Sequence, residues 1–140
     1  MKRQAILRIH SLIQHPGDKP MIDQQQLNAT WIQKVTTDYI QYKETREGQE
    51  VRTTVKVTDE EVLILRGGDI DMRLPLKAHT TQRGTYRNEP LVWAMMVEAE
   101  DVTIERSEEK NKWRATYRLH IGEEEIGKYT LTMTYTEGTL

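Results

Sequence analysis

The residue types most often used in catalysis are few in this chain, and their spacing matches no familiar motif. The four histidines stand at positions 10, 15, 79 and 120, with neither a His-x-His pair nor an HExxH pattern among them. Cysteine is absent, which excludes disulfides, thiolate metal sites and a cysteine nucleophile. The two serines, Ser11 and Ser107, lie outside any GxSxG pattern. The sequence therefore predicts a protein that is not an enzyme, with no catalytic residue, no metal site and no cofactor.

A glycine pair and three acidic clusters are the other candidates for chemistry. Gly67 and Gly68, followed by Asp69, could cradle an anion with their backbone amides, but they separate two strand-like runs and precede no helix, so a hairpin turn is favoured. The acidic clusters at 98–101, 108–109 and 123–125 fall at turns or on polar strand positions, which is typical of a solvated rim. A hydrolytic or isomerase site formed by His79 or Asp69 at the mouth of a barrel is a third alternative.

Composition and charge describe an ordinary globular protein. The chain has 140 residues, 36% of them hydrophobic and 30% charged, which favours one domain over residues 1–140 with its own core. The net charge of −2 favours no partner class. In the N-terminal stretch MKRQAILRIHSLIQ, Arg8 and His10 interrupt what would be the apolar core of a signal peptide, so a cytoplasmic protein without membrane contact is expected.

Alternation of apolar and polar residues with a period of two recurs along most of the chain. It is clearest at 51–57, 112–121 and 127–136, where the odd-numbered residues form the apolar face and are expected to point inward. The other expected strands are less regular: 5–14, 25–36, 39–46, 62–66, 70–76, 80–86 and 91–105. Turn-forming residues separate most neighbouring strands, and no segment has a sustained helical repeat.

This pattern predicts an all-β protein, a single antiparallel up-and-down β-barrel of about eight to ten strands. Closure into a barrel removes the exposed sheet edges that so many sequential strands would otherwise leave. A β-sandwich is the alternative fold. The barrel is favoured because short turns join most consecutive strands, whereas Greek-key sandwiches need longer crossings.

The segment TVKVTDEEVLILRGGDIDM and the terminal MTYTEGT resemble the YwiB-like family of small, uncharacterised bacterial proteins. The likeness covers nearly the whole chain in strand order and length. It implies a calycin-like (lipocalin-like) β-barrel fold and carries over no catalytic residue. The family's glycine-containing aromatic turn is replaced here by TYRNEPLVW, which has no glycine.

The expected inward face is the most informative feature for function. It carries six aromatic residues with a polar N–H or O–H group, together with two methionines, and the chain has no phenylalanine. These candidate ligand-binding residues are Trp31, Trp93, Met95, Trp113, Tyr117, Tyr129, Met133 and Tyr135. They could line a cavity for a small apolar or amphiphilic ligand, or they could fill the barrel, since interiors of barrels of this size are found both ways.

The expected outward face is charged and carries little aromatic surface. Arg52, Lys56, Arg114, Arg118 and Lys128 alternate with threonines there, and without aromatic residues on the same face a nucleic-acid surface is unfavoured. The sequence therefore favours a binding protein for a small apolar or amphiphilic ligand. The alternative is a protein or RNA interaction module that uses the outer surface and holds no ligand.

Overall fold

The computed structural model describes residues 1–140 and contains ten β-strands and no helix. It therefore has no helix long and apolar enough to cross a membrane. The strands are β1 (Lys2–Gln14), β2 (Met21–Gln33), β3 (Asp38–Arg46), β4 (Gln49–Val57), β5 (Glu61–Gly68), β6 (Asp71–Lys77), β7 (Thr80–Asn88), β8 (Leu91–Glu105), β9 (Asn111–Ile121) and β10 (Glu124–Glu137).

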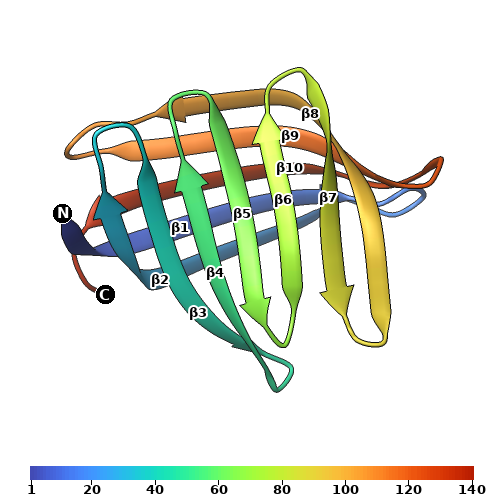
Figure 1. Ribbon diagram of the computed structural model, residues 1–140, viewed down its shortest axis with the longest axis horizontal. Coiled ribbons are helices and arrows are strands. Elements are labelled where there is room, and N and C mark those ends of the chain that lie inside the picture. Colours follow the sequence, from blue (N-terminus) through green and yellow to red (C-terminus); the bar gives the residue numbers. More distant parts are fainter.

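The strands form one closed barrel in which each strand pairs antiparallel with the next, and β10 closes the sheet on β1. The β1–β10 pair has ten residues in register, from Ala5 opposite Glu137 to Gln14 opposite Lys128. Both termini lie at the same end of the molecule (Figure 1). The up-and-down barrel predicted from the sequence is confirmed.

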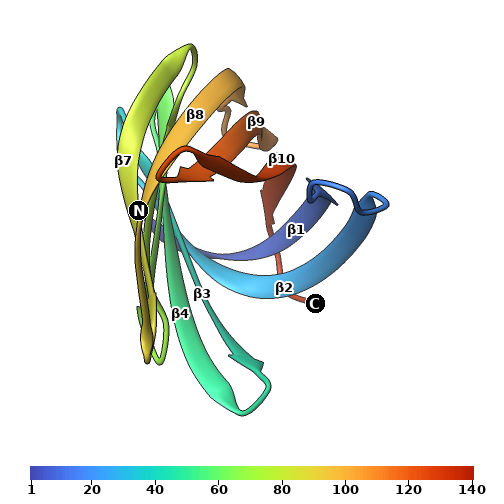
Figure 2. The same cartoon turned by 90° about the vertical axis from the view of Figure 1, so that its right-hand side faces the viewer.

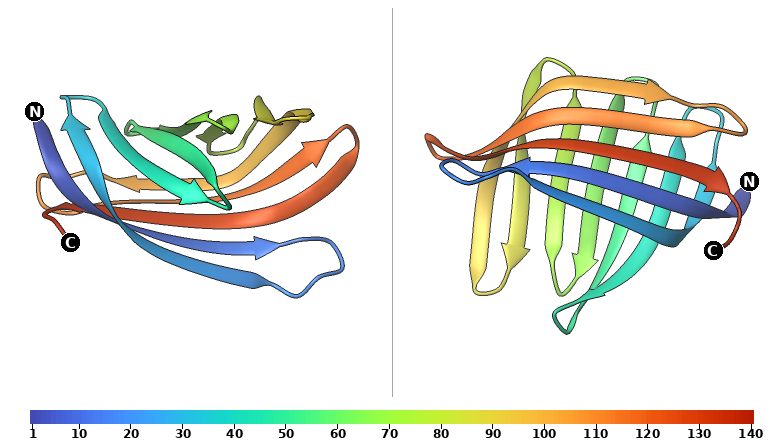
Figure 3. Two further views of the ribbon diagram at one scale, coloured as in Figure 1. Left: turned by 90° about the horizontal axis from the view of Figure 1, so that it is seen from below. Right: turned by 180° about the vertical axis from the view of Figure 1, so that it is seen from behind.

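The barrel is flattened into two layers whose strands run nearly crosswise. Strands β3–β7 form one layer, and β1, β2, β9 and β10 form the other (Figures 1 and 3). Strand β8 belongs to both, because it pairs with β7 through residues 91–99 and with β9 through residues 96–105. A bulge between Ala99 and Asp101 lies in the middle of this long strand, and bulges of this kind let a strand bend from one layer into the other.

Strand alternation sets which side chains enter the barrel. In β4, the odd-numbered residues Val51, Thr53, Val55 and Val57 are all buried, and their even-numbered neighbours are not. In β9, the odd positions from 111 to 117 are buried. In β10, Met133 and Tyr135 are buried, and burial lessens toward the start of the strand. The inward parity predicted for these three strands is confirmed.

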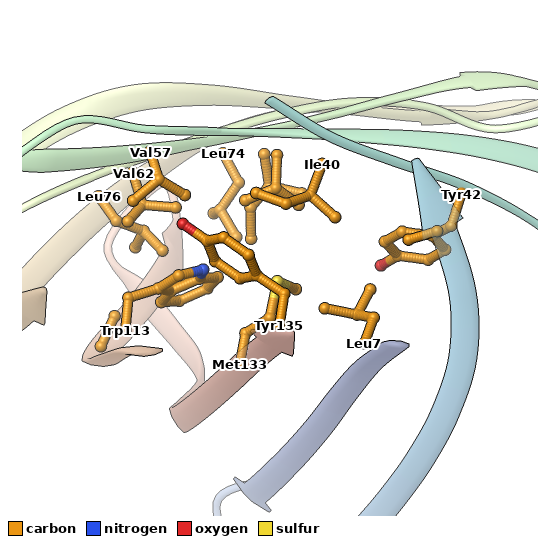
Figure 4. Close-up of a cluster of buried hydrophobic side chains, with 14 of the residues drawn as sticks. Leu7, Ile40, Tyr42, Val57, Val62, Leu74, Leu76, Trp113, Met133 and Tyr135 are labelled. Carbon is orange, nitrogen blue, oxygen red and sulfur yellow. The ribbon is translucent and has the colours of Figure 1, made fainter. Parts of the chain in front are cut away.

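One end of the barrel is filled by a dense apolar core. Side chains from both layers pack against one another there, and all of them are buried (Figure 4). The largest fully buried members are Trp31, Trp113, Tyr135, Leu7, Ile40, Leu76, Met133, Val55, Val57, Val62 and Val97. The rings of Trp31 and Tyr135 meet edge to face with their centroids 5.2 Å apart, a favoured arrangement for aromatic pairs. We call this half of the barrel the closed end.

A buried polar network ties the closed end together. The hydroxyl of Tyr135 donates a hydrogen bond of 2.6 Å to Oδ2 of Asp38, whose side chain is 1% exposed. Nε of Arg106 donates to the same oxygen at 3.1 Å, and its Nη1 donates to Oδ1 of Asp59 at 3.0 Å. The carboxylate of Asp38 is thus both ion-paired and hydrogen-bonded, as a buried charge requires.

At the opposite end the two layers separate. Only four residues at the end of β2, Thr30 to Gln33, pair with β3, although β2 has 13 residues. Across the barrel, the first residues of β8, from Leu91 to Met95, pair with β7 but not with β9. The β1–β2 and β9–β10 hairpins therefore diverge from the β3–β8 layer, as Figure 2 shows from this side. We call this half the open end.

Candidate ligand-binding cavity

A cavity of about 430 Å³ occupies the open end of the barrel. Seventeen of its 23 lining residues are hydrophobic, and they come from both layers. The apolar and aromatic part of the lining consists of Ile9, Leu12, Ile13, Tyr42, Ile64, Met72, Leu74, Tyr86, Leu91, Trp93, Met95, Tyr117, Leu119, Ile126, Tyr129, Leu131 and Met133. The polar part consists of Ser11, Asp23, Gln25, Arg46, Arg66 and Thr130.

The structure divides the eight residues expected on the inward face into two groups. Five of them line the cavity: Trp93, Met95, Tyr117, Tyr129 and Met133, the last of which also packs in the core of the closed end. The other three, Trp31, Trp113 and Tyr135, are at most 1% exposed and pack in the core of the closed end. The two interpretations of the aromatic interior, a filled core and an open cavity, therefore each describe one half of this barrel.

A single inward-facing row crosses six strands of one layer at the level of the cavity. Cross-strand pairing places its members side by side in the order Tyr42, Thr53, Arg66, Met72, Tyr86 and Trp93. We call it the mouth row; all its members except Thr53 line the cavity. Directly opposed residues of an antiparallel sheet project to the same face, so these side chains share one wall. Beneath it lies a row of buried residues, Ile40, Val55, Ile64 and Leu74.

Trp93 stands at the rim of the cavity. Its side chain is 39% exposed, and its ring lies 5.9 Å from that of Tyr86, centroid to centroid. Its neighbours Leu91 and Val92 are also exposed. An indole at a rim can contact a bound molecule with its face while its N–H stays near water.

Tyr117 and Tyr129 form a stacked pair on the other wall, with ring centroids 5.2 Å apart and planes inclined by 16°. Burial raises the pKa of Tyr117 strongly, and the neighbouring Tyr129 adds to the effect. Burial likewise raises the pKa of Tyr42 and of Tyr129. These phenols stay protonated at neutral pH and can act as hydrogen-bond donors inside the cavity.

Four members of the mouth row were not recognised in the sequence: Tyr42, Arg66, Met72 and Tyr86. Arg66 continues the inward parity of β5 after Val62 and Ile64. The inward position of Arg66 follows from the period of two, because every second residue from Val62 leads to it. The alternation of β5 is not visible in the sequence, because the outward residues Leu63 and Leu65 are apolar too.

The other charged groups near the mouth row have partners. The side chain of Glu44 is 9% exposed and lies 3.1 Å from Arg46 in an ion pair. The side-chain amide of Gln25 joins this pair, because it donates to Glu44 at 3.2 Å and accepts from Arg46 at 2.5 Å. The guanidinium of Arg66, in contrast, takes part in none of the ion pairs or hydrogen bonds formed between side chains, and its Nε is buried without a partner.

The histidines and the turn residues singled out by the sequence do not line the cavity. His15 lies behind two residues that do, because its Nδ1 is 3.0 Å from the carbonyl oxygen of Ile126 and its ring meets that of Tyr129 edge to face, with centroids 6.2 Å apart. His10 is exposed on the outer face, and His120 lies 3.0 Å from Glu98 in an outer-face pair. Asp69 accepts a hydrogen bond of 2.8 Å from the backbone of Glu50 in the β5–β6 turn, while His79 stands in the β6–β7 turn at the other end of β6. No group of three or more His, Asp or Glu side chains could hold a metal ion.

The expected basic stripe on the outer face is partly neutralised. Arg118 pairs with Glu100 at 3.0 Å and with Glu125 at 3.4 Å, and Lys128 pairs with Glu100 at 3.7 Å. Shared carboxylates of this kind lower the local positive potential that a phosphate backbone would need.

The fold and the cavity define a closed, ten-stranded, up-and-down β-barrel with one filled and one open end. Comparison with known proteins finds the family described as "Domain of unknown function (DUF1934)" over residues 7–133. The chain belongs to this family. It is 25% identical to the "Uncharacterized beta-barrel protein YwiB" of Bacillus subtilis (strain 168) over 141 residues, covering 99% of both chains. The resemblance to YwiB-like proteins seen in the sequence is confirmed.

The crystal structure of the YwiB protein from Bacillus subtilis has the same fold. The two structures superpose with a TM-score of 0.87 at 22% sequence identity, over 99% of this chain and 94% of that one. At this identity the likeness establishes the barrel and its strand order, and the function of this chain has to be argued from its own cavity.

Proposed function

We propose that this protein binds one small apolar or amphiphilic molecule in the open half of its barrel. The observation that carries the proposal is the cavity of about 430 Å³, lined by 17 hydrophobic residues and open at one end of the barrel. Its volume falls within the range of small-molecule sites, roughly 300–1,000 Å³. A protein that needed only a stable core would gain from filling this space, because every unfilled volume forfeits packing contacts.

The chemical character of the lining supports a ligand with a large apolar part. Methionines 72, 95 and 133 line the cavity, and methionine side chains adapt to ligands of different shape. Tyr42, Tyr86, Tyr117 and Tyr129 add aromatic surface with a hydroxyl group on each ring. Such a lining binds an apolar body over most of its surface and offers a small number of directed hydrogen bonds.

In this proposal the protein is a calycin-like carrier that acts in the cytoplasm. It performs no reaction and needs no cofactor, because the titratable groups that line the cavity do not form a nucleophile–base arrangement. Its outer surface binds neither nucleic acid nor membrane.

The experiment is uptake of a neutral fluorophore, N-phenylnaphthylamine, followed by its fluorescence. We expect one probe per chain and a weaker affinity in Trp93→Ala, because the indole forms part of the rim. The matched control is Tyr39→Ala, which removes an aromatic ring that lies on the outward face of β3 and lines no part of the cavity. Both variants are first compared with the wild type by circular dichroism, so that a loss of uptake is assigned to the cavity.

A folded wild type that takes up no probe would overturn the proposal. So would equal affinities in the wild type and in Trp93→Ala together with a weaker one in Tyr39→Ala, since the binding surface would then lie outside the barrel. Native mass spectrometry of the protein purified from its own host gives an independent check. A co-purifying small molecule supports the interior site, and a protein or RNA partner without one supports the outer surface.

A further inference from the structure

The wall of the cavity contains one cation, Arg66, that forms no ion pair within the protein. Arg66 is on the inward parity of β5, between Thr53 on one side and Met72 on the other. No carboxylate lies within ion-pairing distance of its guanidinium, and its buried Nε has no hydrogen-bond partner in the protein. Arg66 is half-buried, and a guanidinium presents five N–H donors in a planar fork, so a ligand in the cavity can accept hydrogen bonds from donors that the protein leaves unused.

A second hollow lies beside Arg66 and is lined by residues from both faces of the sheet. It has a volume of about 650 Å³, lies over strands β2–β5 where β2 and β3 diverge, and shares Tyr42 and Arg66 with the cavity. Ten of its 13 lining residues are polar or glycine, and no carboxylate is among them. Arg66 lines it from the inward face of the sheet, whereas Lys43 and Arg52 line it from the outward face, and none of the three forms an ion pair. The hollow is therefore positively charged, and Arg66 is the one of its three cations that also faces the apolar cavity.

Because the guanidinium of Arg66 lies in the wall of an apolar cavity without an ion-pair partner, we infer that the ligand is an amphiphile with one compact anionic headgroup, such as a carboxylate or a phosphate monoester. Its headgroup binds the guanidinium of Arg66 and the hydroxyl of Tyr42, and its apolar body lies in the cavity. This inference rests on the proposed function and specifies its ligand class.

The spacing along the mouth row suits this division. Tyr42 and Arg66 are two strands apart, about 10 Å between their backbones, with the small side chain of Thr53 between them. Two long side chains that flank a short one can converge over it on the same oxygen atoms. From Arg66 the row continues through Met72, Tyr86 and Trp93, so an apolar chain bound at Arg66 would run along apolar side chains toward the rim.

The other charged groups that face this region do not replace the ligand. Glu44 also points inward on β3, but it is paired with Arg46 at 3.1 Å. Asp23 also lines the cavity, from β2, and it forms no ion pair with Arg66. Tyr42 keeps its proton at neutral pH, because burial raises its pKa, and its hydroxyl is therefore a donor to an anion.

The test compares ligands that share one chain and differ in the headgroup. Laurate, lauryl phosphate, lauryl alcohol and acetate are titrated by calorimetry, with N-phenylnaphthylamine uptake measured in parallel. We expect the wild type to bind laurate or lauryl phosphate at least about tenfold more tightly than the alcohol, with the order of the two anions identifying the headgroup, and to bind acetate far more weakly. In Arg66→Gln the affinity for the anions should fall by about ten- to a hundredfold and that for the alcohol should not.

Two further variants complete the design. Arg66→Lys keeps the charge and should retain part of the preference for anions, and Arg114→Gln removes an exposed outer-face arginine and should change nothing. Raised salt should weaken laurate binding in the wild type more than in Arg66→Gln.

Equal affinity of the wild type for laurate and lauryl alcohol would overturn the headgroup inference, and so would unchanged laurate binding in a folded Arg66→Gln. If acetate bound as tightly as laurate, the apolar cavity would contribute nothing to the affinity, and the inference that the ligand is an amphiphile would be wrong. In each of these cases uptake of the neutral probe leaves the proposed function standing. If the wild type takes up neither the probe nor any of the lauryl ligands, both proposals fail together.

Discussion

The hydroxyl of Tyr135 donates a 2.6 Å hydrogen bond to the carboxylate of Asp38, across 97 positions of the sequence and between two opposed layers of the barrel. Arg106 meets the same carboxylate from the end of β8 at 3.1 Å. Three distant segments of the chain thus meet at one buried charge, at the end of the barrel that has no cavity.

Removal of the hydroxyl should therefore weaken the fold measurably. Tyr135→Phe is expected to lose about 1.5–3 kcal/mol of the free energy of unfolding, the range for a hydrogen bond to a charged group. Asp38→Ala should lose about 3–5 kcal/mol, because it leaves Arg106 without its buried partner as well. Both values come from urea unfolding followed by circular dichroism.

Tyr129→Phe is the matched control for Tyr135→Phe, because the Tyr129 hydroxyl makes no hydrogen bond to the protein and its ring is only partly buried. Its effect should stay below about 0.5 kcal/mol. Equal losses in the two Tyr→Phe variants would show that the Tyr135–Asp38 contact contributes nothing specific.

The two ends of the barrel should respond differently to loss of an indole. Trp31 is fully buried against Tyr135, so Trp31→Ala leaves a void and should cost about 3–5 kcal/mol. Trp93 is 39% exposed at the rim, has fewer contacts to lose, and Trp93→Ala should cost about 1 kcal/mol. Thermal and urea unfolding of the two variants measure the difference. A loss in Trp93→Ala as large as in Trp31→Ala would mean that the rim belongs to the packed core.

Regular alternation explains why much of the fold could be predicted from the sequence. From Val51 onward in β4 and from Trp113 onward in β9, each inward residue is apolar or small and each outward residue is polar, so parity alone identifies the buried face of these strands. Closure of the barrel could be predicted from the number of strands and the short turns between them, because an open sheet would leave unpaired edge strands. These features depend on local sequence and on simple geometry.

The cavity could not be predicted in the same way, because it depends on how far the two layers separate. That separation follows from the short pairing of β2 with β3, which begins at Thr30 although β2 begins at Met21. Nothing in the sequence of β2 marks the residue at which its pairing with β3 stops. The Asp38–Arg106 pair was missed for a related reason, because its partners are 68 positions apart and no local spacing connects them.

Stability should fall at high pH because of two buried phenols. Burial raises the pKa of Tyr117 and of Tyr135 above the ordinary value of 10.0, and the hydrogen bond to Asp38 raises that of Tyr135 further. The folded state keeps both protons where the unfolded chain releases them. Their contribution is therefore fully present below pH 10.0 and is lost as the pH rises above it.

Each of the two phenols should contribute a slope of about −1.4 kcal/mol per pH unit above that value. Urea unfolding at several pH values between about 9 and about 11.5 measures the slope. Tyr117→Phe and Tyr135→Phe should each make it less steep by one such contribution, and an identical slope in the wild type and both variants would count against the assignment.

The last prediction concerns the stability cost of the unpaired cation in the cavity wall. Arg66→Met replaces the guanidinium with an uncharged, flexible side chain that can lie against its neighbours Met72 and Ile64. Because the charge has no partner and its Nε is buried, we expect the variant to be more stable than the wild type by about 0.5–2 kcal/mol in urea unfolding without ligand. Arg114→Met, on the exposed outer face, should stay within about 0.5 kcal/mol of the wild type.

A residue that lowers stability and is nevertheless present is expected where function needs it, and laurate binding should be weakened in the same Arg66→Met protein. Arg66→Met could instead be less stable than the wild type by about 1 kcal/mol or more, which is about the contribution of one hydrogen bond. That result would show that the guanidinium stabilises the barrel without ligand, and it would contradict the prediction.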